Sequence, residues 1–371
     1  MKENKVWLSS PHMSGEEMKY IQQAFDENWI APLGPNVEGL EKELENFLQN
    51  KSRVAALSSG TAALHLALIM AGIKAGDEVL CQSMTFSASV NPVVYLGAKP
   101  VFVDSERKTW NMCPELLEQA IIDRISKGIK PKAIIAVHLY GMPFQFDEIS
   151  SISKHYEIPL IEDAAEALGS EYKDLKCGTL GDFSVLSFNG NKIITTSGGG
   201  ALVVKDIEHK KKTVFLATQA RDDAPHYQHS EIGYNYRMSN IVAGIGRGQL
   251  EVLSDRVAAR RRNFEYYKEH ISDCCGIEYQ DESEGFFSNR WLSCILTDSY
   301  ETREKIRLEL GKSDIESRPL WKPMHLQPVF EKYERYTNGV SEDLFERGLC
   351  LPSGSNLELI TLDRVIEKIK F

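Results

Sequence analysis

The 371-residue sequence has no long apolar run, and this absence narrows its possible locations. No stretch approaches the roughly 20 apolar residues of a membrane helix. The N-terminal segment MKENKVWLSSPHMSGEE lacks the apolar core and the cleavage site of a secretory signal. We therefore expect a cytoplasmic protein without a membrane partner.

Positively charged residues are fewer than negatively charged ones. Lysine and arginine number 43 against 53 aspartates and glutamates, which gives a formal net charge of −10. Nucleic acids and anionic membranes require a basic face, so we expect neither as a partner. A phosphorylated small molecule stays compatible with this charge, because it needs only a local pocket of donors.

Cysteine and histidine show no metal-binding pattern. The seven cysteines have no CxxC spacing, and the adjacent Cys274 and Cys275 suit neither a simple disulfide framework nor a zinc site. His226 and His229, in the run HYQH, lack a third ligand. We expect buried, reduced thiols and no metal.

Short apolar runs alternate with helix-like segments between about residues 53 and 205. The strand candidates are residues 54–57, 78–81, 99–103, 132–137, 158–162, 183–188 and 200–204. Strands that alternate with helices predict an α/β fold with a mainly parallel, seven-stranded sheet covered by helices. A long helical stretch over 239–271 is expected to connect this region to a smaller C-terminal domain. We expect an N-terminal arm and large domain at 1–250 and a smaller C-terminal α+β domain at 251–371.

The segment SSGTAALHLAL (58–68) predicts a phosphate site. A strand ends there, small residues turn the chain, and a helix begins near Thr61. Free N–H groups and the helix dipole favour a phosphate at such an N-terminus, where Ser59, Gly60 and Thr61 leave room for it. An ordinary capped helix start explains the same residues equally well.

Two carboxylates in IEDAAEALGS (161–170) follow an apolar strand. Glu162 and Asp163 stand at its carboxyl end, where open α/β sheets place ligand-binding groups. Such a residue caps a neighbouring helix or holds the protonated ring nitrogen of a pyridine cofactor. A buried charge is costly unless it is paired, and a cationic ring would supply the partner.

Lys192 lies in SFNGNKIITTSGGG (187–200), between turn residues and three glycines. A neutral lysine amine forms a Schiff base with a carbonyl, although most lysines in turns are simply solvated. The order of phosphate-type helix start, strand-end acid and lysine matches what pyridoxal phosphate requires, and Ser187 can add a hydroxyl to the phosphate.

These segments resemble the pyridoxal phosphate-dependent sugar-nucleotide aminotransferases of the DegT/StrS group, which have the fold-type I architecture. The likeness covers nearly the whole chain. It rests on seven segments in order: SSGTAALHLAL, SMTFSASVNPVVYLGAKPVFVD, HLYG, IEDAAEALGS, SFNGNKIITTSGGG, GYNYRMSN and RPLWKPMHLQPVF. PHMSGEEMKYIQQAFDENWIAPLG and the last segment most resemble the branch that aminates C4 of UDP-4-keto-6-deoxy-N-acetylglucosamine for bacillosamine.

The resemblance implies roles for the cofactor site. Lys192 is the implied Schiff-base lysine, and Asp163 is the implied partner of the pyridine nitrogen. The remaining implied cofactor contacts are Gly60, Thr61 and Ser187 at the phosphate, Phe86 on the ring, Glu166 near the 3-hydroxyl, and Asn235 at the neighbouring subunit's phosphate. Phe86 also fits a core position, and many members have glutamine at the position of Glu166, whose protonation stays open. Asn235 implies a homodimer with shared active sites.

The resemblance further implies a sugar-nucleotide site. Its residues are Trp29, Ile30, Ala31 and Pro32 of the arm, with Arg237, Arg318, Trp321, Lys322 and His325. Arginine binds diphosphate in a bidentate manner, and an aromatic face covers a sugar or a base. A structural salt bridge for Arg237, and domain packing for Trp321 and His325, are the alternatives. His138, in HLYG, is expected to be a satisfied histidine rather than a proton carrier.

The implied reaction is a two-stage transamination. Glutamate gives its amino group to the cofactor and leaves as 2-oxoglutarate, and a UDP-linked 4-keto sugar then receives the group at C4. Lys192 moves the proton from Cα. Three alternatives stay open: amination at C3 or on a dTDP- or GDP-sugar, another pyridoxal phosphate reaction such as an aldol-type cleavage, and a regulatory protein that has lost catalysis. Dehydratases of this fold carry histidine at the lysine position, so Lys192 argues against that activity.

Overall fold

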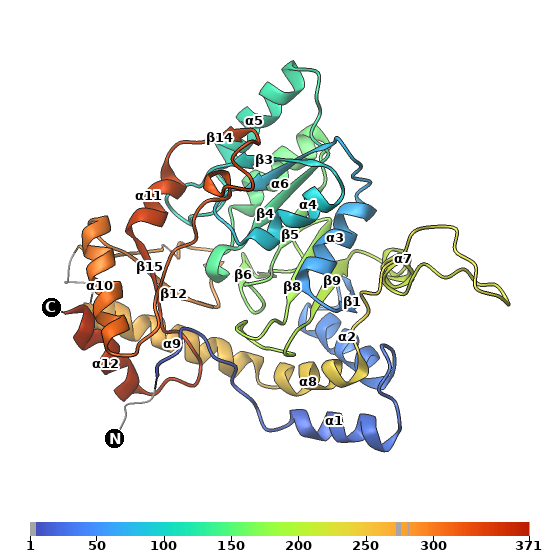
Figure 1. Cartoon of the computed structure of the whole chain (residues 1–371), viewed down its shortest axis with the longest axis horizontal. Coiled ribbons are helices and arrows are strands. Elements are labelled where there is room, and N and C mark those ends of the chain that lie inside the picture. Colours follow the sequence, from blue (N-terminus) through green and yellow to red (C-terminus); the bar gives the residue numbers. More distant parts are fainter. Residues whose placement is uncertain (1–4, 272–275, 281, 371) are drawn as a thin grey trace.

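A computed structural model describes residues 5–271, 276–280 and 282–370, so Cys274 and Cys275 lie outside the described residues. Its centre is an eight-stranded sheet in the order β1-β9-β8-β5-β4-β2-β3-β14 (Figure 1). The strands are β1 (Arg53–Leu57), β2 (Glu78–Gln82), β3 (Lys99–Val103), β4 (Ala133–Val137), β5 (Leu160–Asp163), β8 (Phe183–Ser187), β9 (Gly200–Val204) and β14 (Arg335–Tyr336). β9 runs antiparallel to its two neighbours, and the other neighbouring strands are parallel. The mainly parallel sheet confirms the predicted fold class.

Helices cover both faces of this sheet, because its strands present apolar side chains alternately to each side. In β4, Ala133 and Ile135 face one core cluster and Ile134 and Ala136 face another. The first face packs against α3 (Gly60–Met70), α4 (Asn91–Tyr95) and α7 (Ile207–Ala217). The opposite face packs against α5 (Pro114–Ser126) and α6 (Phe146–Tyr156), and further along against α2 (Pro35–Phe47) and α8 (Asn240–Leu250).

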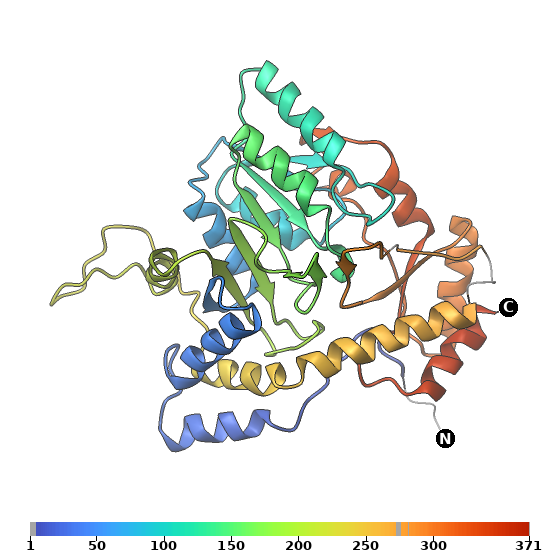
Figure 2. The ribbon, with the colours of Figure 1, turned by 180° about the vertical axis from the view of Figure 1, so that it is seen from behind.

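The C-terminal part builds a second layer around a small antiparallel sheet (Figure 2). Its strands, in spatial order, are β10 (Glu278–Tyr279), β12 (Ser293–Leu296), β15 (Gly348–Leu351) and β13 (Arg318–Pro319). The surrounding helices are α9 (Leu253–Ile271), α10 (Tyr300–Lys312), α11 (Val340–Arg347) and α12 (Leu359–Ile369). β6 (Glu171–Tyr172), β7 (Leu175–Lys176) and β11 (Phe286–Phe287) form a third, short sheet, and α1 (Glu17–Asp26) packs on α8.

Several details differ from the sequence-based expectation. The helical stretch over 239–271 is two helices, α8 and α9, separated at residues 251–252. The large sheet has an eighth strand, β14, which comes from beyond residue 251 and pairs with β3. Val6 forms a β-bridge with Ile315 and lies in the core of the small layer. The boundary at 250/251 stays a prediction, and these two segments cross it.

The topology places the carboxyl ends of three strands at one edge of the large sheet. β1, β5 and β8 run in the same direction, so their carboxyl ends lie on the same edge. Ligand sites in open α/β sheets form at this edge. Among the helices of the described residues, none is long and apolar enough to cross a membrane.

Candidate active site

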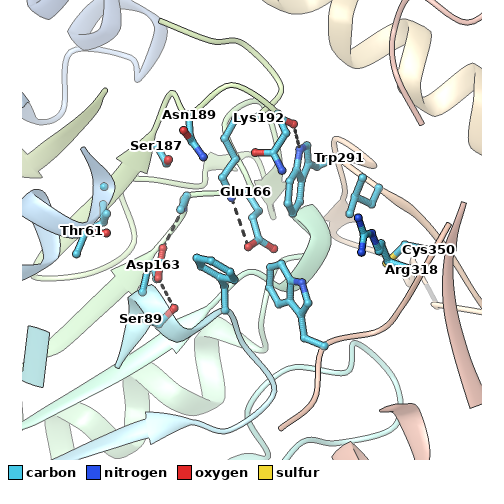
Figure 3. Close-up of a pocket in the computed structure, with 18 of the residues that line it drawn as sticks. Thr61, Ser89, Asp163, Glu166, Ser187, Asn189, Lys192, Trp291, Arg318 and Cys350 are labelled. Atoms are coloured by element: carbon cyan, nitrogen blue, oxygen red, sulfur yellow. Dashed lines mark hydrogen bonds and ion pairs between the residues drawn. The ribbon is translucent and has the colours of Figure 1, made fainter. Parts of the chain in front are cut away.

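A cavity of about 800 Å³ opens at the carboxyl ends of β1, β5 and β8 and is bordered by the small layer (Figure 3). Eleven of the residues singled out in the sequence line it: Ser59, Gly60, Thr61, Phe86, Asp163, Glu166, Ser187, Lys192, Arg318, Trp321 and Lys322. They come from segments spread over more than half of the chain. The fold therefore brings the lysine, the strand-end acid and the phosphate-type helix start together in one cavity.

Lys192 lies in the loop between β8 and β9 and points into the cavity (Figure 3). Its side chain is only 12% exposed. The Nζ atom is 3.6 Å from Oε1 of Glu166 and 4.1 Å from the centre of the Trp291 ring. The lysine is therefore partly buried between an acid and an aromatic face, and the solvated-loop alternative does not describe it.

Glu166 is the buried acid beside Lys192. Its Oε2 accepts a hydrogen bond of 2.7 Å from the backbone N–H of Tyr140. Burial raises the pKa of the Glu166 carboxyl to about 7, although the positive charge of Lys192 opposes the rise. A carboxyl with such a pKa can take up or release a proton near neutral pH.

Asp163 ends β5 with a buried carboxylate, 6% exposed. Its Oδ2 accepts from the Ser89 hydroxyl at 2.7 Å, and its Oδ1 accepts from the backbone N–H of Ala165 at 3.1 Å. Among the described residues, no lysine, arginine or histidine lies within ion-pair distance of this carboxylate. A protonated ring nitrogen in the cavity would supply the missing positive partner, so this residue fits a pyridine cofactor.

The start of α3 forms the opposite wall of the cavity. Ser59 caps the helix, since its hydroxyl accepts from the backbone N–H of Ala62 at 3.0 Å. A Cβ atom built on Gly60 would lie 3.1 Å from Cβ of Ser187, so glycine keeps this corner open. Thr61 and Ser187 also line the cavity there. The helix N-terminus and the two hydroxyls fit a phosphate, with Ser59 also serving as the cap.

Two of the expected substrate residues contact protein groups instead of the cavity. Arg237 forms an ion pair with Glu41 and donates to the Ala56 carbonyl at 3.0 Å, which is the salt-bridge alternative. His325 is 1% exposed and lies within 2.7 Å of the Ser83 hydroxyl and 3.1 Å of Glu342 Oε1, which is the packing alternative. Neither side chain lines the cavity of its own chain.

The arm residues 29–32 and Asn235 also lie outside this cavity. All are exposed, with Trp29 at 42% and Ile30 at 52%. Asn235 forms an isolated β-bridge with Thr218 at the base of the long loop that projects beyond α7 (Figure 1). Within one chain the structure does not bring these residues to Lys192.

His138, the histidine of HLYG, forms hydrogen bonds in the protein core. Its Nδ1 accepts from the Phe144 N–H at 3.2 Å, and Nε2 lies 2.7 Å from Glu162 Oε1. Glu162 also accepts hydrogen bonds from the loop that follows β7, including the Leu180 N–H at 2.7 Å. His138, Glu162 and Cys177 lie close enough together to suggest a metal site, but hydrogen bonds already occupy the histidine and the glutamate.

Several cavity residues were not singled out in the sequence. They are Leu8, Ser89, Asn189, Asn191, Trp291, Leu292, Glu316, Phe345 and Cys350, among others. Ser89 lies inside the quoted segment SMTFSAS, so the segment itself carried a signal for it. Trp291 lies in no quoted segment, and only the fold brings it to a lysine about a hundred residues earlier.

Comparison with known proteins identifies the family. The model of the DegT/DnrJ/EryC1/StrS aminotransferase family matches residues 11–370. The EpsN protein of Bacillus subtilis (strain 168), which is named as a pyridoxal phosphate-dependent aminotransferase, is 52% identical over 98% of this chain and 94% of its own. The GDP-perosamine synthase of Escherichia coli O157:H7 is 40% identical over 94% of this chain and 93% of its own.

A solved structure shows the same architecture. The protein Spr1654 of Streptococcus pneumoniae, named as a sugar aminotransferase and solved in its PLP form, superposes with a TM-score of 0.90. It is 28% identical, and the match covers 99% of this chain and 98% of that one. The chain described here thus belongs to the DegT/DnrJ/EryC1/StrS family of pyridoxal phosphate-dependent sugar aminotransferases.

Proposed function

We propose that this aminotransferase moves an amino group from glutamate to C4 of a 4-keto-6-deoxy sugar nucleotide, with UDP-4-keto-6-deoxy-N-acetylglucosamine as the first candidate acceptor. The observation that carries the proposal is the cavity in which Lys192, Glu166 and Asp163 converge opposite the start of α3. The choice of C4 and of UDP rests on the likeness of the arm and of RPLWKPMHLQPVF to the bacillosamine branch.

Each residue has a distinct task in this proposal. When it is bound, pyridoxal phosphate supplies an electrophilic aldehyde and a ring that accepts electrons. The N–H groups at the start of α3, with Thr61 and Ser187, hold the phosphate. Asp163 would keep the proton on the ring nitrogen, and Nζ of Lys192 would hold the aldehyde until the donor's amino group displaces it. The freed amine of Lys192 would then carry the proton that leaves Cα of the donor. Glu166, 3.6 Å away, exchanges a proton with Nζ.

The wall formed by the small layer suits the acceptor. Arg318, Trp321 and Lys322 line the cavity on this side, and the ring centres of Phe86 and Trp321 are 5.6 Å apart. Arginine and lysine can bind diphosphate oxygens, and the two rings offer apolar faces to a sugar or a base. A GDP-linked keto sugar is the second candidate acceptor, favoured by the 40% identity to a GDP-perosamine synthase.

The active enzyme is proposed to be a homodimer with shared sites. Residues 29–32 and Asn235 are exposed and lie outside the cavity of their own chain, although the family resemblance gives them ligand-binding roles. A second copy that supplies these residues reconciles the two observations.

A panel of acceptors tests the substrate. The purified enzyme is assayed with glutamate and with 4-keto and 3-keto sugars linked to UDP, GDP or dTDP, and the products are identified by mass spectrometry and NMR. We expect the highest kcat/KM for UDP-4-keto-6-deoxy-N-acetylglucosamine. A higher value for a GDP-linked 4-keto sugar would select the second candidate, and amination at C3 would overturn the proposed position.

The role of Lys192 has its own test. Sodium borohydride should fix the cofactor covalently to Lys192 in the wild-type protein, and mass spectrometry of peptides locates the adduct. Lys192→Ala should lose the adduct and at least about 10³-fold in turnover, because it removes both the nucleophile and the proton carrier. Wild-type turnover in this variant would refute the mechanism.

A further inference from the structure

One segment of the small layer holds both sides of the Lys192–Glu166 pair. Trp291 donates its indole N–H to the carbonyl of Asn191 at 2.7 Å, and its ring lies 4.1 Å from Nζ of Lys192. The same side chain therefore contacts the peptide that precedes the lysine and the far end of the lysine itself. Figure 3 shows the indole beside the end of the Lys192 side chain.

Asn289, two residues earlier, holds the loop that carries Glu166. Its side-chain amide donates to the carbonyls of Glu166 at 2.8 Å and Leu168 at 2.9 Å. Its Oδ1 accepts from the backbone N–H of Trp291 at 2.9 Å. Asn289 thus fixes the start of Trp291 and the Glu166 loop at the same time.

A buried arginine supports this arrangement from behind. Arg260, in α9, is 1% exposed and donates to the Trp291 carbonyl at 2.5 Å and to the Ser9 hydroxyl at 3.0 Å. Ser9 in turn donates to the Asn191 carbonyl at 2.7 Å. The carbonyl next to Lys192 therefore receives two donors, and Arg260 anchors the residues that supply both of them.

We propose that Trp291 is a positioning residue for Lys192: its N–H fixes the lysine loop, and its ring holds the free Nζ beside Glu166 inside the cavity. This inference rests on the proposed function, which gives Lys192 the proton-carrying role. A lysine has four rotatable side-chain bonds, so ordering its side chain costs rotamer entropy. An aromatic face that attracts the ammonium reduces the number of directions available to it.

Three variants test the proposal. Trp291→Leu removes the ring and the indole N–H, and Trp291→Phe keeps a ring face without the N–H. Trp7→Leu is the matched control, because Lys5 lies 3.9 Å over the Trp7 ring, which is 52% exposed, and neither residue lines the cavity. The first readout is the rate of the single-turnover reaction with glutamate. This reaction is monitored by the loss of visible cofactor absorbance.

We expect Trp291→Leu to lower the rate constant at saturating glutamate about tenfold and Trp291→Phe about threefold. The half-saturating glutamate concentration should stay within about twofold of wild type in both variants. Because Trp291 is 2% exposed, Trp291→Leu should also lower the thermal midpoint by several degrees, and Trp291→Phe should lower it less. Trp7→Leu should match wild type. A purely structural role would change cofactor affinity and glutamate affinity along with the thermal midpoint, and that pattern would overturn the proposal.

A second readout needs no cofactor. The cofactor-free protein is treated with a trace of acetic anhydride, and acetylation of Lys192 is measured by mass spectrometry against the exposed Lys211. Because the ring shields and holds Nζ, Trp291→Leu should raise the relative labelling of Lys192 about threefold. Wild-type labelling together with a wild-type rate constant in this variant would refute the inference. Failure of borohydride to fix the cofactor at Lys192 in the wild-type protein would refute the proposed function instead.

Discussion

Glu166 shows how burial sets the chemistry of a single carboxyl. The side chain is 4% exposed, it accepts one backbone N–H, and its nearest cation is 3.6 Å away. Loss of hydration outweighs these favourable contacts, so the pKa rises from its ordinary 4.5 to about 7. Glutamine at this position would be an uncharged group of nearly the same shape.

Glu166→Gln should therefore stabilise the cofactor-free protein above neutral pH. Between pH 4.5 and 7 the unfolded glutamate is ionised while the folded one keeps its proton, so wild-type stability falls as the pH rises through this window. The variant lacks this loss. At pH 8 we expect it to exceed wild type by on the order of 3 kcal/mol in the free energy of unfolding, and the gap should close near pH 4.5.

Urea unfolding of the cofactor-free protein at pH 5 and pH 8 measures this difference. Glu331→Gln removes the same charge from an exposed position and serves as the control. A gap that is equal at both pH values, or that favours wild type at pH 8, would contradict the prediction.

Sequence reasoning reached the residues that sit in local patterns. Lys192, Asp163 and Gly60 lie next to strand ends, and strand ends of parallel neighbours meet at one edge of a sheet. It left two readings of Arg237 open, because its partner Glu41 lies in α2, nearly two hundred residues away. Trp291 was not predicted as a site residue, because no local sequence pattern marks a tryptophan that contacts a distant loop.

At the scale of elements, the site depends on a tight junction between α3 and β9. Gly200 opens β9, and a Cβ atom there would lie 2.4 Å from the backbone N of Gly60 and 2.7 Å from the Leu186 carbonyl oxygen. These neighbours are backbone atoms of the helix start and of β8. A side chain at position 200 would therefore displace the start of α3, where the phosphate is proposed to bind.

Gly200→Ala should lower the free energy of unfolding by about 3 kcal/mol and weaken binding of pyridoxal phosphate about tenfold. Thermal unfolding without cofactor and a fluorescence titration with cofactor measure the two effects. Gly198→Ala is the control for stability, because no atom lies within 4 Å of the added carbon. Equal thermal midpoints for the two variants would show that the junction tolerates the extra atom.

The elements themselves were largely predictable. The seven apolar runs are all strands, because each is buried on both faces and long enough to read as an uninterrupted apolar segment. The eighth strand was missed because β14 has only two residues and carries no such run. The break between α8 and α9 was missed because residues 250–253, with the sequence LEVL, contain no glycine or proline to announce it.

At the scale of the whole molecule, the proposed shared-site dimer makes a quantitative prediction. Lys192→Ala and Asn235→Ala should each have little activity as homodimers. In a mixed dimer, however, the subunit with an intact Lys192 receives an intact Asn235 from its partner. Unfolding and refolding an equal mixture should restore about a quarter of wild-type activity, because about half of the dimers are mixed and each has one complete site.

The assay is steady-state amination after refolding, with each variant refolded alone as the control. If both sites were built within single chains, the mixture would show only the average of the two variants. That average would contradict the shared-site arrangement and leave the chemistry of Lys192 unaffected.

The hydrogen bonds at Asn191 have a consequence for synthesis on the ribosome. The carbonyl of this residue is held by Ser9, near the beginning of the chain, and by Trp291, a hundred residues after it. Ser9 is flanked by Leu8, whose carbonyl accepts from the backbone N–H of Ser353. A nascent chain that has only just exposed Lys192 therefore lacks Trp291 and Ser353, and the loop that carries Lys192 does not yet have these contacts. All of these contacts can form only after residue 353 has been translated.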